Sequence, residues 1–319
     1  MTYIGIDVSK DSFVAAYPAQ VGYKTKTFKN TPEGVHEFIL SLPQECHCVM
    51  EATGNYSMLL LYLLQKANIL ISMENPQKIK HFSRAMMSVT KTDELDAKLI
   101  AMYGEKMNPT PYKIPSETIL LLKQKRTVLR QLKKQLVATI NLQHSLSVLP
   151  KQDPTCKVAI EKTIKFIRKQ ISKMEEEITH LTKTEFDRQL SLLTSIKGIS
   201  VTVASALILA TGGFTYFSNA KQLSRYLGLC PTYQQSGTSV NIKGHINRNG
   251  DSHLRSQLYV AAFASIRCNT ACKETFNNLK ARGKSGKLAT VAVANKLIRQ
   301  AFAVVTSNKP YEDGYVSTH

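Results

Sequence analysis

Long apolar stretches and paired cysteines are both missing from this chain of 319 residues. No run of about 18 apolar residues occurs, which is the length that a helix needs to cross a bilayer, so no membrane partner is expected. The opening MTYIGIDVSK has the pattern of a strand and lacks the basic and then apolar layout of a signal peptide. The six cysteines show no CxxC spacing, which argues against zinc and for reduced thiols in the cytoplasm.

Acidic residues are also scarce. They number 23 against 42 lysines and arginines, which gives a net charge of +19 and an isoelectric point near 9.6. Such an excess is typical of a protein that binds nucleic acid, although a membrane-surface protein could share it. The imbalance is strongest from Lys221 to Arg299, with thirteen basic residues and two acids. Phosphates would neutralise this charge; a solvated basic surface is the alternative.

The sequence pattern changes along the chain and predicts an α/β part followed by all-α parts. Residues 1–105 alternate short apolar strands with helical segments, as in an α/β domain. Residues 106–116 hold three prolines and are predicted to be a linker. Residues 117–186 are predicted to form a coiled-coil helical hairpin, residues 187–310 a mainly helical domain, and residues 311–319 a tail. The chain is long enough for several domains of this size.

The coiled-coil prediction depends on an a/d seam. Apolar residues recur at alternating spacings of four and three at Ile160, Ile164, Ile167, Ile171, Met174, Ile178 and Leu181. The seam requires a partner helix, which leaves two alternatives: a hairpin within one chain or an oligomerisation arm. For the second alternative, Ile164, Ile171 and Ile178 are expected in the contact of a dimer or tetramer.

Residues 193–210 have the pattern of a helix-hairpin-helix element. In such an element a turn, here at Lys197 and Gly198, presents backbone N–H groups to a phosphate at a helix N-terminus. A tight packing turn is the alternative. Further nucleic-acid contacts are predicted among the basic residues of the C-terminal half, at Lys243, Arg248, Arg255, Lys280, Arg282, Lys284 and Lys287.

Four carboxylates lie where strands end or a helix begins. Asp7 ends one apolar strand, Glu51 ends a second, and Asp93 and Asp96 lie three residues apart on one face of a helix that starts near Thr92. Carboxylate oxygens suit Mg²⁺, or Mn²⁺ in its place, so these acids predict a metal site directed at a polyanion. Ribonuclease-H-like nucleases use this pattern to hold two metal ions around a phosphate. For Asp93 the alternative is a first-turn acid favoured by the helix dipole.

The motifs together resemble one family. Residues 4–10 (IGIDVSK), 51–56 (EATGNY) and 91–101 (KTDELDAKLIA) look like the DEDD transposases of insertion-sequence family one-ten, whose relatives include the pilin-inverting recombinases. The second half matches in the same order, with LGLCP at 227–231, SG at 236–237, GHINRNGD at 244–251 and LR at 254–255. Together the motifs cover nearly the whole chain.

The resemblance implies a fold and a mechanism. It implies a RuvC-like N-terminal domain with Asp7, Glu51, Asp93 and Asp96 as metal ligands, and a C-terminal transposase domain in which Ser236 is the nucleophile. It also implies recombination of double-stranded DNA, guidance by a structured non-coding RNA, and an active site that two subunits complete together. The residues alone favour the alternative, in which Ser236 is a loop serine that caps the turn at Gly237.

Two other functions stay open. One is a structure-specific nuclease of the Holliday-junction-resolving kind, in which water is the nucleophile and no covalent intermediate forms. The other is a nucleic-acid-binding protein without catalysis, against which the intact set of four acids speaks.

Overall fold

A computed structural model describes residues 1–87, 92–112, 115–236, 240–246 and 250–314, and for residues 232–236 and 240–245 it describes the backbone alone. The chain divides into two compact units, Met1–Ile114 and Pro115–His319. This division is coarser than the five segments predicted from the sequence, so those segments stay a prediction. All six cysteines are free thiols.

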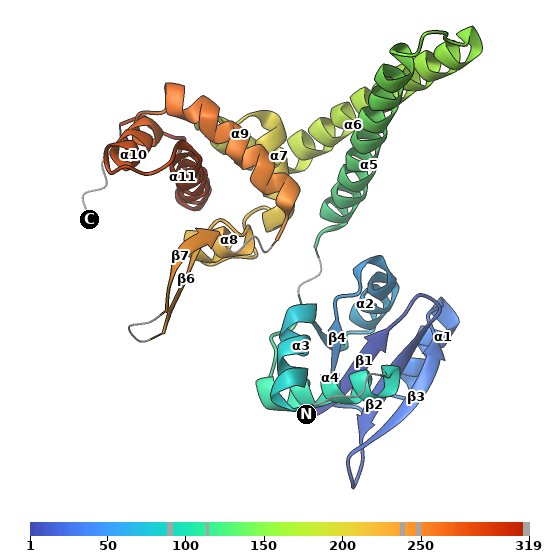
Figure 1. The fold of residues 1–319 in the computed structure, drawn as a ribbon. Helices are drawn as coiled ribbons and strands as arrows, with labels where there is room; N and C mark the ends of the chain where they lie inside the picture. Colours follow the sequence, from blue (N-terminus) through green and yellow to red (C-terminus); the bar gives the residue numbers. More distant parts are fainter. Residues whose placement is uncertain (88–91, 113–114, 237–239, 247–249, 315–319) are drawn as a thin grey trace. The chain divides into compact units, whose positions relative to one another are not determined.

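The N-terminal unit is an α/β fold built on one mixed sheet (Figure 1). Its strands are β1 (Thr2–Val8), β2 (Ser12–Pro18), β3 (Tyr23–Lys29), β4 (Cys46–Glu51) and β5 (Leu70–Glu74). Its helices are α1 (Pro32–Leu40), the short η1 (Gly54–Ser57), α2 (Met58–Lys66), α3 (Pro76–Ala85) and α4 (Asp93–Met107). The strand order is β3-β2-β1-β4-β5, in which β1, β2 and β3 are antiparallel and β4 lies parallel to β1 and β5.

The two faces of this sheet differ. One face carries the larger core, in which Ile4, Ile6 and Met50 pack with Phe38 of α1 and Leu60 of α2. The other face is covered by α4, whose Ala97 and Ala101 pack against Val14 and Ala16 of β2. Because side chains alternate along a strand, each strand divides its residues between these two faces.

The first part of the predicted linker is tied to the sheet. The hydroxyl of Ser72 in β5 lies 2.7 Å from the carbonyl oxygen of Thr110, and the backbone N–H of Tyr112 donates to the carbonyl oxygen of Ile71 at 2.7 Å. These contacts make residues up to 112 part of the N-terminal unit. The three prolines indicated a break in helix, which the structure has. They did not indicate the hydrogen bonds that hold the segment to the sheet.

The C-terminal unit is mainly helical. It contains α5 (Glu117–Ser147), α6 (Pro154–Thr194), α7 (Val201–Thr211), α8 (Ala220–Tyr226), a hairpin of β6 (Pro231–Ser236) and β7 (Val240–Ile246), α9 (Ser252–Cys268), α10 (Thr270–Ala281) and α11 (Gly286–Ser307). The sequence analysis did not predict the β6–β7 hairpin. Figure 1 shows α5 and α6 side by side as a long arm.

The apolar seam of α6 is used within one chain. Ile164 and Ile178 are buried, with 7% and 8% of their surface exposed. Lys133 of α5 forms an ion pair with Glu175 of α6 at 2.6 Å. The expectation that Ile164 and Ile178 lie in a contact between subunits is therefore corrected, because both are buried within the chain. Ile171 is half-buried, and its place in such a contact stays a prediction. The helix α6 also runs past residue 186 and bends at Phe186, whose backbone is not helical.

The C-terminal core is built around α11. This helix is long and apolar enough by length and composition alone to cross a membrane. Its Ala294, Leu297 and Ile298 are fully buried and pack with Leu254 of α9 and Leu207 of α7. This is the position of a core helix in a folded domain.

Candidate functional site

Three neighbouring strands of the N-terminal sheet carry acids at the same edge, β4 and β5 at their last residues and β1 at Asp7, one residue before its end. In the parallel pair β1–β4, Ile6 lies opposite Met50, so the next residues, Asp7 and Glu51, follow at the same level. Glu51 lies opposite Glu74 of β5. Asp7 and Glu51 are both half-buried. The register thus aligns carboxylates across β1, β4 and β5.

These acids belong to the sheet face that α4 covers. A Cβ atom added to Gly5 would lie 2.1 Å from the backbone nitrogen of Ala101 and 2.2 Å from the carbonyl oxygen of Ala97. The α4 backbone therefore passes directly over Gly5. Since side chains two residues apart share a face, Asp7 belongs to the same side as Gly5. The same alternation places Glu51 with Val49, which packs against Leu99 and Ile100 of α4.

The direction of α4 brings its first turn to this edge. Gly104, late in the helix, lies against Tyr3 and Val49, whereas Ala97 and Ala101 lie over Gly5. The helix therefore runs opposite to β1, and its N-terminus lies toward the end of β1 that carries Asp7. Asp93 precedes Ala97 by one turn.

The start of α4 suits acidic side chains. Thr92 caps the helix by accepting a hydrogen bond from the N–H of Leu95 at 3.2 Å. The partial positive charge at a helix N-terminus stabilises Asp93 and Asp96, which lie in the first turn. Asp93 is exposed and Asp96 is half-buried. The four predicted acids thus occupy the strand ends and the helix start of one unit. Among the residues that the structure describes, no three His, Cys, Asp or Glu side chains form a group that could hold a metal ion.

Glu74 is an acid of this row that the sequence analysis missed. It is 9% exposed and forms an ion pair with Lys78, one turn into α3, at 2.8 Å. The hydrogen bond that the Lys78 ammonium donates to Glu74 raises the pKa of Lys78. The signal was present, because Glu74 ends an apolar strand as Asp7 and Glu51 do. The ion pair with Lys78 therefore neutralises the charge of Glu74, the register partner of Glu51.

The nucleophile predicted from the resemblance lies on the β6–β7 hairpin. Ser236 is the last residue of β6, where its backbone pairs with that of Val240. The side chains of Ser236 and Lys243 lie outside the described part of the chain, as do Gly237 and Arg248 entirely. The role of Ser236 therefore stays a prediction.

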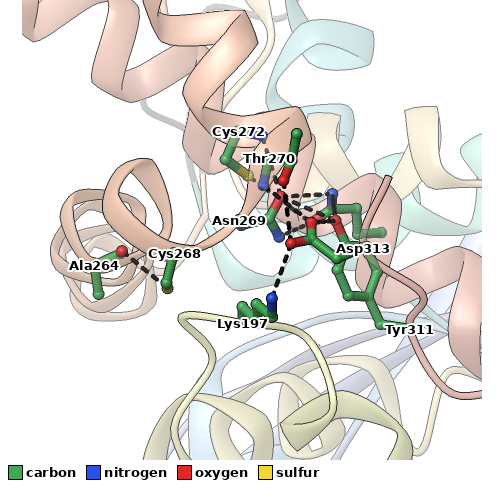
Figure 2. A network of polar contacts seen from close by, with 9 residues as sticks. Lys197, Ala264, Cys268, Asn269, Thr270, Cys272, Tyr311 and Asp313 are labelled. Atoms are coloured by element: carbon green, nitrogen blue, oxygen red, sulfur yellow. Dashed lines mark hydrogen bonds and ion pairs between the residues drawn. The ribbon is translucent and has the colours of Figure 1, made fainter. Parts of the chain in front are cut away.

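Two predicted phosphate contacts are engaged within the protein. The Lys197 ammonium forms an ion pair with Asp313 at 2.9 Å, as Figure 2 shows. Asp313 also accepts hydrogen bonds from the backbone and hydroxyl of Thr270. The pKa of Asp313 is lowered to about 2, chiefly by Lys197 and then by the Thr270 N–H. Gly198 has a φ of +104°, and a Cβ atom there would lie 2.0 Å from the Ser265 hydroxyl. The glycine in this turn is thus explained by close packing on α9.

Arg255 has a structural contact. Its guanidinium donates to the carbonyl oxygens of Leu227 at 3.2 Å and Gly250 at 3.1 Å. These bonds connect the start of α9 to the segment between α8 and β6, and hence to one end of the hairpin that carries Ser236.

The remaining predicted contacts form one exposed group. Lys280, Arg282, Lys284 and Lys287, called here the basic turn, lie at the end of α10, in the connection to α11 and in its first turn, and all four are exposed. Lys287 also lines a cavity of about 900 Å³ together with Lys296 and Arg299. Pro231 and Ile246, at the base of the β6–β7 hairpin, line the same cavity. A positive surface thus adjoins the base of the hairpin, which is a suitable arrangement for binding a phosphate backbone.

Comparisons with known proteins agree with the resemblance. Residues 4–149 match the family model DEDD_Tnp_IS110, described as a transposase, and residues 190–277 match the Transposase IS116/IS110/IS902 family. The chain is 30% identical to the pilin gene-inverting protein of Moraxella bovis and 29% identical to that of Moraxella lacunata, in both cases over 98% of each chain. It is 33% identical to an IS110 protein of Streptomyces coelicolor over 38% of this chain and 30% of that one.

Among solved structures, RuvC of T. thermophilus in complex with a Holliday junction substrate matches 35% of this chain and 99% of its own, with 14% identity and a TM-score of 0.27. The family assignment depends instead on the full-length relatives and on the two family models. The chain belongs to the IS110 family of DEDD transposases and recombinases, enzymes that cleave and join DNA.

Proposed function

We propose that this transposase recombines two DNA duplexes by metal-dependent strand cleavage and exchange, with Ser236 as nucleophile and with guidance by a structured non-coding RNA. The observation that carries the proposal is the alignment of acids at one sheet edge of the N-terminal unit, with the first turn of α4 directed to the same edge. Family membership supports the reaction class, and the order of the C-terminal motifs supports the serine.

The four acids proposed as ligands have the donor chemistry that divalent metal ions require. Asp7, Glu51, Asp93 and Asp96 offer only carboxylate oxygens, the donors that Mg²⁺ and Mn²⁺ prefer over softer metals. The half-buried positions of Asp7, Glu51 and Asp96 favour ligation, because water screens their charge less than it would on an open surface. Bound metal ions would polarise a phosphodiester and offset the charge that develops on its oxygens.

The chemistry assigned to Ser236 is a transesterification. Its Oγ attacks the phosphorus of one strand, a phosphoserine ester forms, and the bond from phosphorus to one deoxyribose oxygen breaks. The serine proton leaves to a base, and the released deoxyribose oxygen takes up a proton. Because one phosphate ester replaces another, the step needs no external energy. A serine hydroxyl is a weak nucleophile without such help. The covalent ester conserves the bond energy for joining a second strand.

The proposed partners are double-stranded DNA, a guide RNA and further copies of the chain. An RNA that pairs with DNA carries the sequence information, so the protein needs mainly backbone and shape contacts. The exposed basic turn would supply such contacts, together with Lys296 and Arg299, which line the otherwise largely apolar cavity next to it. The six free thiols are consistent with the cytoplasmic location that we propose.

The decisive experiment traps the covalent intermediate. The full chain is incubated with labelled DNA, its RNA and Mg²⁺, and the product is denatured and analysed for a protein–DNA adduct. We expect an adduct with the wild type and with Ser239→Ala, the neighbouring control, and none with Ser236→Ala. Strand cleavage by Ser236→Ala at the wild-type rate and without an adduct would identify water as the nucleophile and favour the resolving-nuclease alternative.

A second experiment tests the metal ligands. Asp7→Asn keeps the shape of the side chain but removes its charge, so strand cleavage should fall by at least 100-fold while nucleic-acid binding in EDTA is retained. The matched control is Asp11→Asn, which changes an exposed acid in the nearby β1–β2 turn. Equal cleavage by both variants would exclude Asp7 from the metal site, and binding without cleavage by the wild type itself would support a binding protein without catalysis.

A further inference from the structure

A small cavity lies where the arm of α5 and α6 joins the rest of the C-terminal unit. Its volume is about 60 Å³, several times what one water molecule requires. Polar and basic side chains reach it from several helices, among them Arg126, Arg130 and Lys133 of α5, Thr202 and Ser205 of α7, and His253 and Gln257 of α9. Glu175 of α6, the ion-pair partner of Lys133, lines it as well. The sequence analysis assigned no role to any of these residues.

Ser205 is the first sign that the cavity has a ligand. Its residue is 4% exposed, and its hydroxyl has no hydrogen-bond partner in the described part of the chain. Serines inside helices commonly donate to the carbonyl four residues earlier, as Thr211 does to Leu207 at 2.7 Å in the same helix. A buried hydroxyl without any partner destabilises the fold. A ligand in the cavity would remove this cost.

The charges around the cavity are the second sign. Arg126 is held by the carbonyl oxygen of Ala206 at 3.1 Å and by Gln257 at 3.3 Å, with Asp251 at 3.7 Å. Burial lowers the pKa of Arg126, Asp251 opposes this effect, and the positive charge of Arg130 lowers the pKa further. Two guanidinium groups of like charge thus line the same cavity.

Arg130, whose side chain is exposed, is the cation of this group that has no balancing acid among the described residues. Lys133 already pairs with Glu175 at 2.6 Å, whereas no hydrogen bond or ion pair connects Arg130 to the residues that the structure describes. An anion between Arg126 and Arg130 would reduce their repulsion, and guanidinium groups bind phosphate oxygens through two parallel N–H groups.

We propose that this cavity, called here the junction cavity, binds one phosphate group of a nucleic-acid backbone between the α5 guanidinium groups and the Ser205 hydroxyl. A phosphate presents several acceptor oxygens, which match the donors of Arg126, Arg130, Thr202 and Ser205. A protein carboxylate offers fewer acceptor oxygens, and a water molecule carries no charge that would balance the guanidinium groups. The identification of the ligand as a backbone phosphate rests on the proposed function. The cavity and its donor groups are features of the structure and do not depend on that function.

The site would fix the arm on nucleic acid. The base of the arm is held to α7 by Leu122 of α5, Ile178 of α6 and Leu209 of α7, which pack together and are buried. A phosphate bound next to this apolar contact would set the direction of the arm relative to the backbone it follows. Phosphate contacts of this kind position a protein without reading sequence.

The test compares binding by full-length variants in EDTA, where cleavage cannot interfere. Arg130→Gln and Ser205→Ala should each weaken binding of duplex DNA, of structured RNA, or of both by about tenfold, the loss of one charge-assisted hydrogen bond. The control is Lys134→Gln, which removes an exposed charge on α5 from a residue that does not line the cavity. A third measurement compares the thermal unfolding of the wild type and the variants in inorganic phosphate and in chloride at equal ionic strength.

Stability separates a binding role for Ser205 from a merely structural one. Without phosphate, Ser205→Ala should unfold at a higher temperature than the wild type, because it removes a buried hydroxyl without a partner. With phosphate, the wild type and Lys134→Gln should gain stability and Ser205→Ala should not. The nucleic acid whose binding falls identifies the source of the phosphate.

Two results overturn the proposal. If Arg130→Gln and Ser205→Ala bind DNA and RNA as well as Lys134→Gln does, the cavity holds water alone. If inorganic phosphate stabilises the protein but both nucleic acids are unaffected, the ligand is a free anion and the assignment to a backbone is wrong. Failure of the Ser236 adduct would leave these measurements unchanged, because none depends on catalysis.

Discussion

Gly5 is the residue on which the close approach of α4 to β1 depends. A Cβ atom there would meet backbone atoms of Ala101 and Ala97 at 2.1 and 2.2 Å, and backbone atoms cannot rotate away as a side chain can. Gly5→Ala should therefore lift the helix and lower the free energy of unfolding by about 1–3 kcal/mol. Strand cleavage should fall as well, since Asp93 and Asp96 move with the helix.

The control for this prediction is Gly286→Ala. Gly286 has open space where a Cβ atom would be and lies in the first turn of α11. Alanine there should be neutral or slightly stabilising. Urea unfolding and strand cleavage of both variants give the comparison, and a wild-type result for Gly5→Ala would show that α4 can shift without disturbing the acids.

His47 gives the N-terminal unit a pH dependence. It is buried in β4, its Nε2 lies 2.8 Å from the Ser72 hydroxyl, and its ring stacks on Tyr3. Burial lowers the pKa of His47, so the folded state prefers the neutral ring. The unfolded state therefore binds more protons near and below pH 6.5, the usual pKa of histidine. Stability from this group is present above that pH and is lost as the pH falls.

Thermal unfolding between pH 7.5 and 5.5 measures this effect. The wild type should lose more stability over this interval than His47→Gln, whose side chain does not titrate. Replacement of the exposed His36 by Gln is the control and should leave the wild-type dependence unchanged. Parallel curves for the wild type and His47→Gln would show that other groups cause the acid sensitivity.

At the scale of elements, the sequence predicted those helices and strands whose capping and turn residues lie next to them in the chain. Thr31 caps α1 by accepting from the N–H of Gly34, with Pro32 at its first position, and β1 and β2 pair as a hairpin across the short turn after Val8. The helix that starts near Thr92 was also predicted and is confirmed as α4. Each of these elements has its signal within a few residues.

The missed elements depend on distant partners. β3 alternates lysine and threonine, and within it only Phe28 is buried, so it becomes a strand through pairing with β2 and not through its own apolar pattern. The α3 cap at Asn75, followed by Pro76, was a readable signal that was not used. The common face of Asp7 and Glu51 follows from the β1–β4 register, which the sequence does not contain.

The basic turn between α10 and α11 should act as one element in binding. Its four exposed cations lie within eight residues. Changing Lys280, Arg282, Lys284 and Lys287 together to glutamine should weaken DNA binding by at least tenfold with little change in sequence preference. The slope of log affinity against log salt should decrease by roughly 0.9 for each duplex phosphate that the variant no longer neutralises.

The control for the basic turn removes equal charge elsewhere. Lys162, Lys165, Arg168 and Lys169 lie on exposed positions of α6 in the arm. If the two fourfold variants show the same decrease in affinity and in salt slope, overall charge determines binding and the turn has no special role. A flat salt response of the wild type itself would contradict a phosphate-dominated interface.

At the scale of the whole molecule, the acids and the predicted nucleophile belong to different compact units. Asp7, Glu51, Asp93 and Asp96 lie in the unit that ends at Ile114, and Ser236 lies in the unit that begins at Pro115. Such a separation permits the acids of one subunit to act with the serine of another. Since Ile164 and Ile178 of α6 are buried within the chain, we expect any oligomer to use other residues for its contact.

We therefore expect a composite active site, which complementation between defective variants can test. Asp7→Asn lacks a metal ligand but retains Ser236, and Ser236→Ala has the opposite defect. When the two are mixed with DNA and RNA, some oligomers combine the intact acids of one subunit with the intact serine of the other, so strand exchange should partly return, most strongly near equal proportions. The double variant mixed with wild type controls for dilution. If both single variants assemble on DNA and no proportion restores strand exchange, each chain completes its own site.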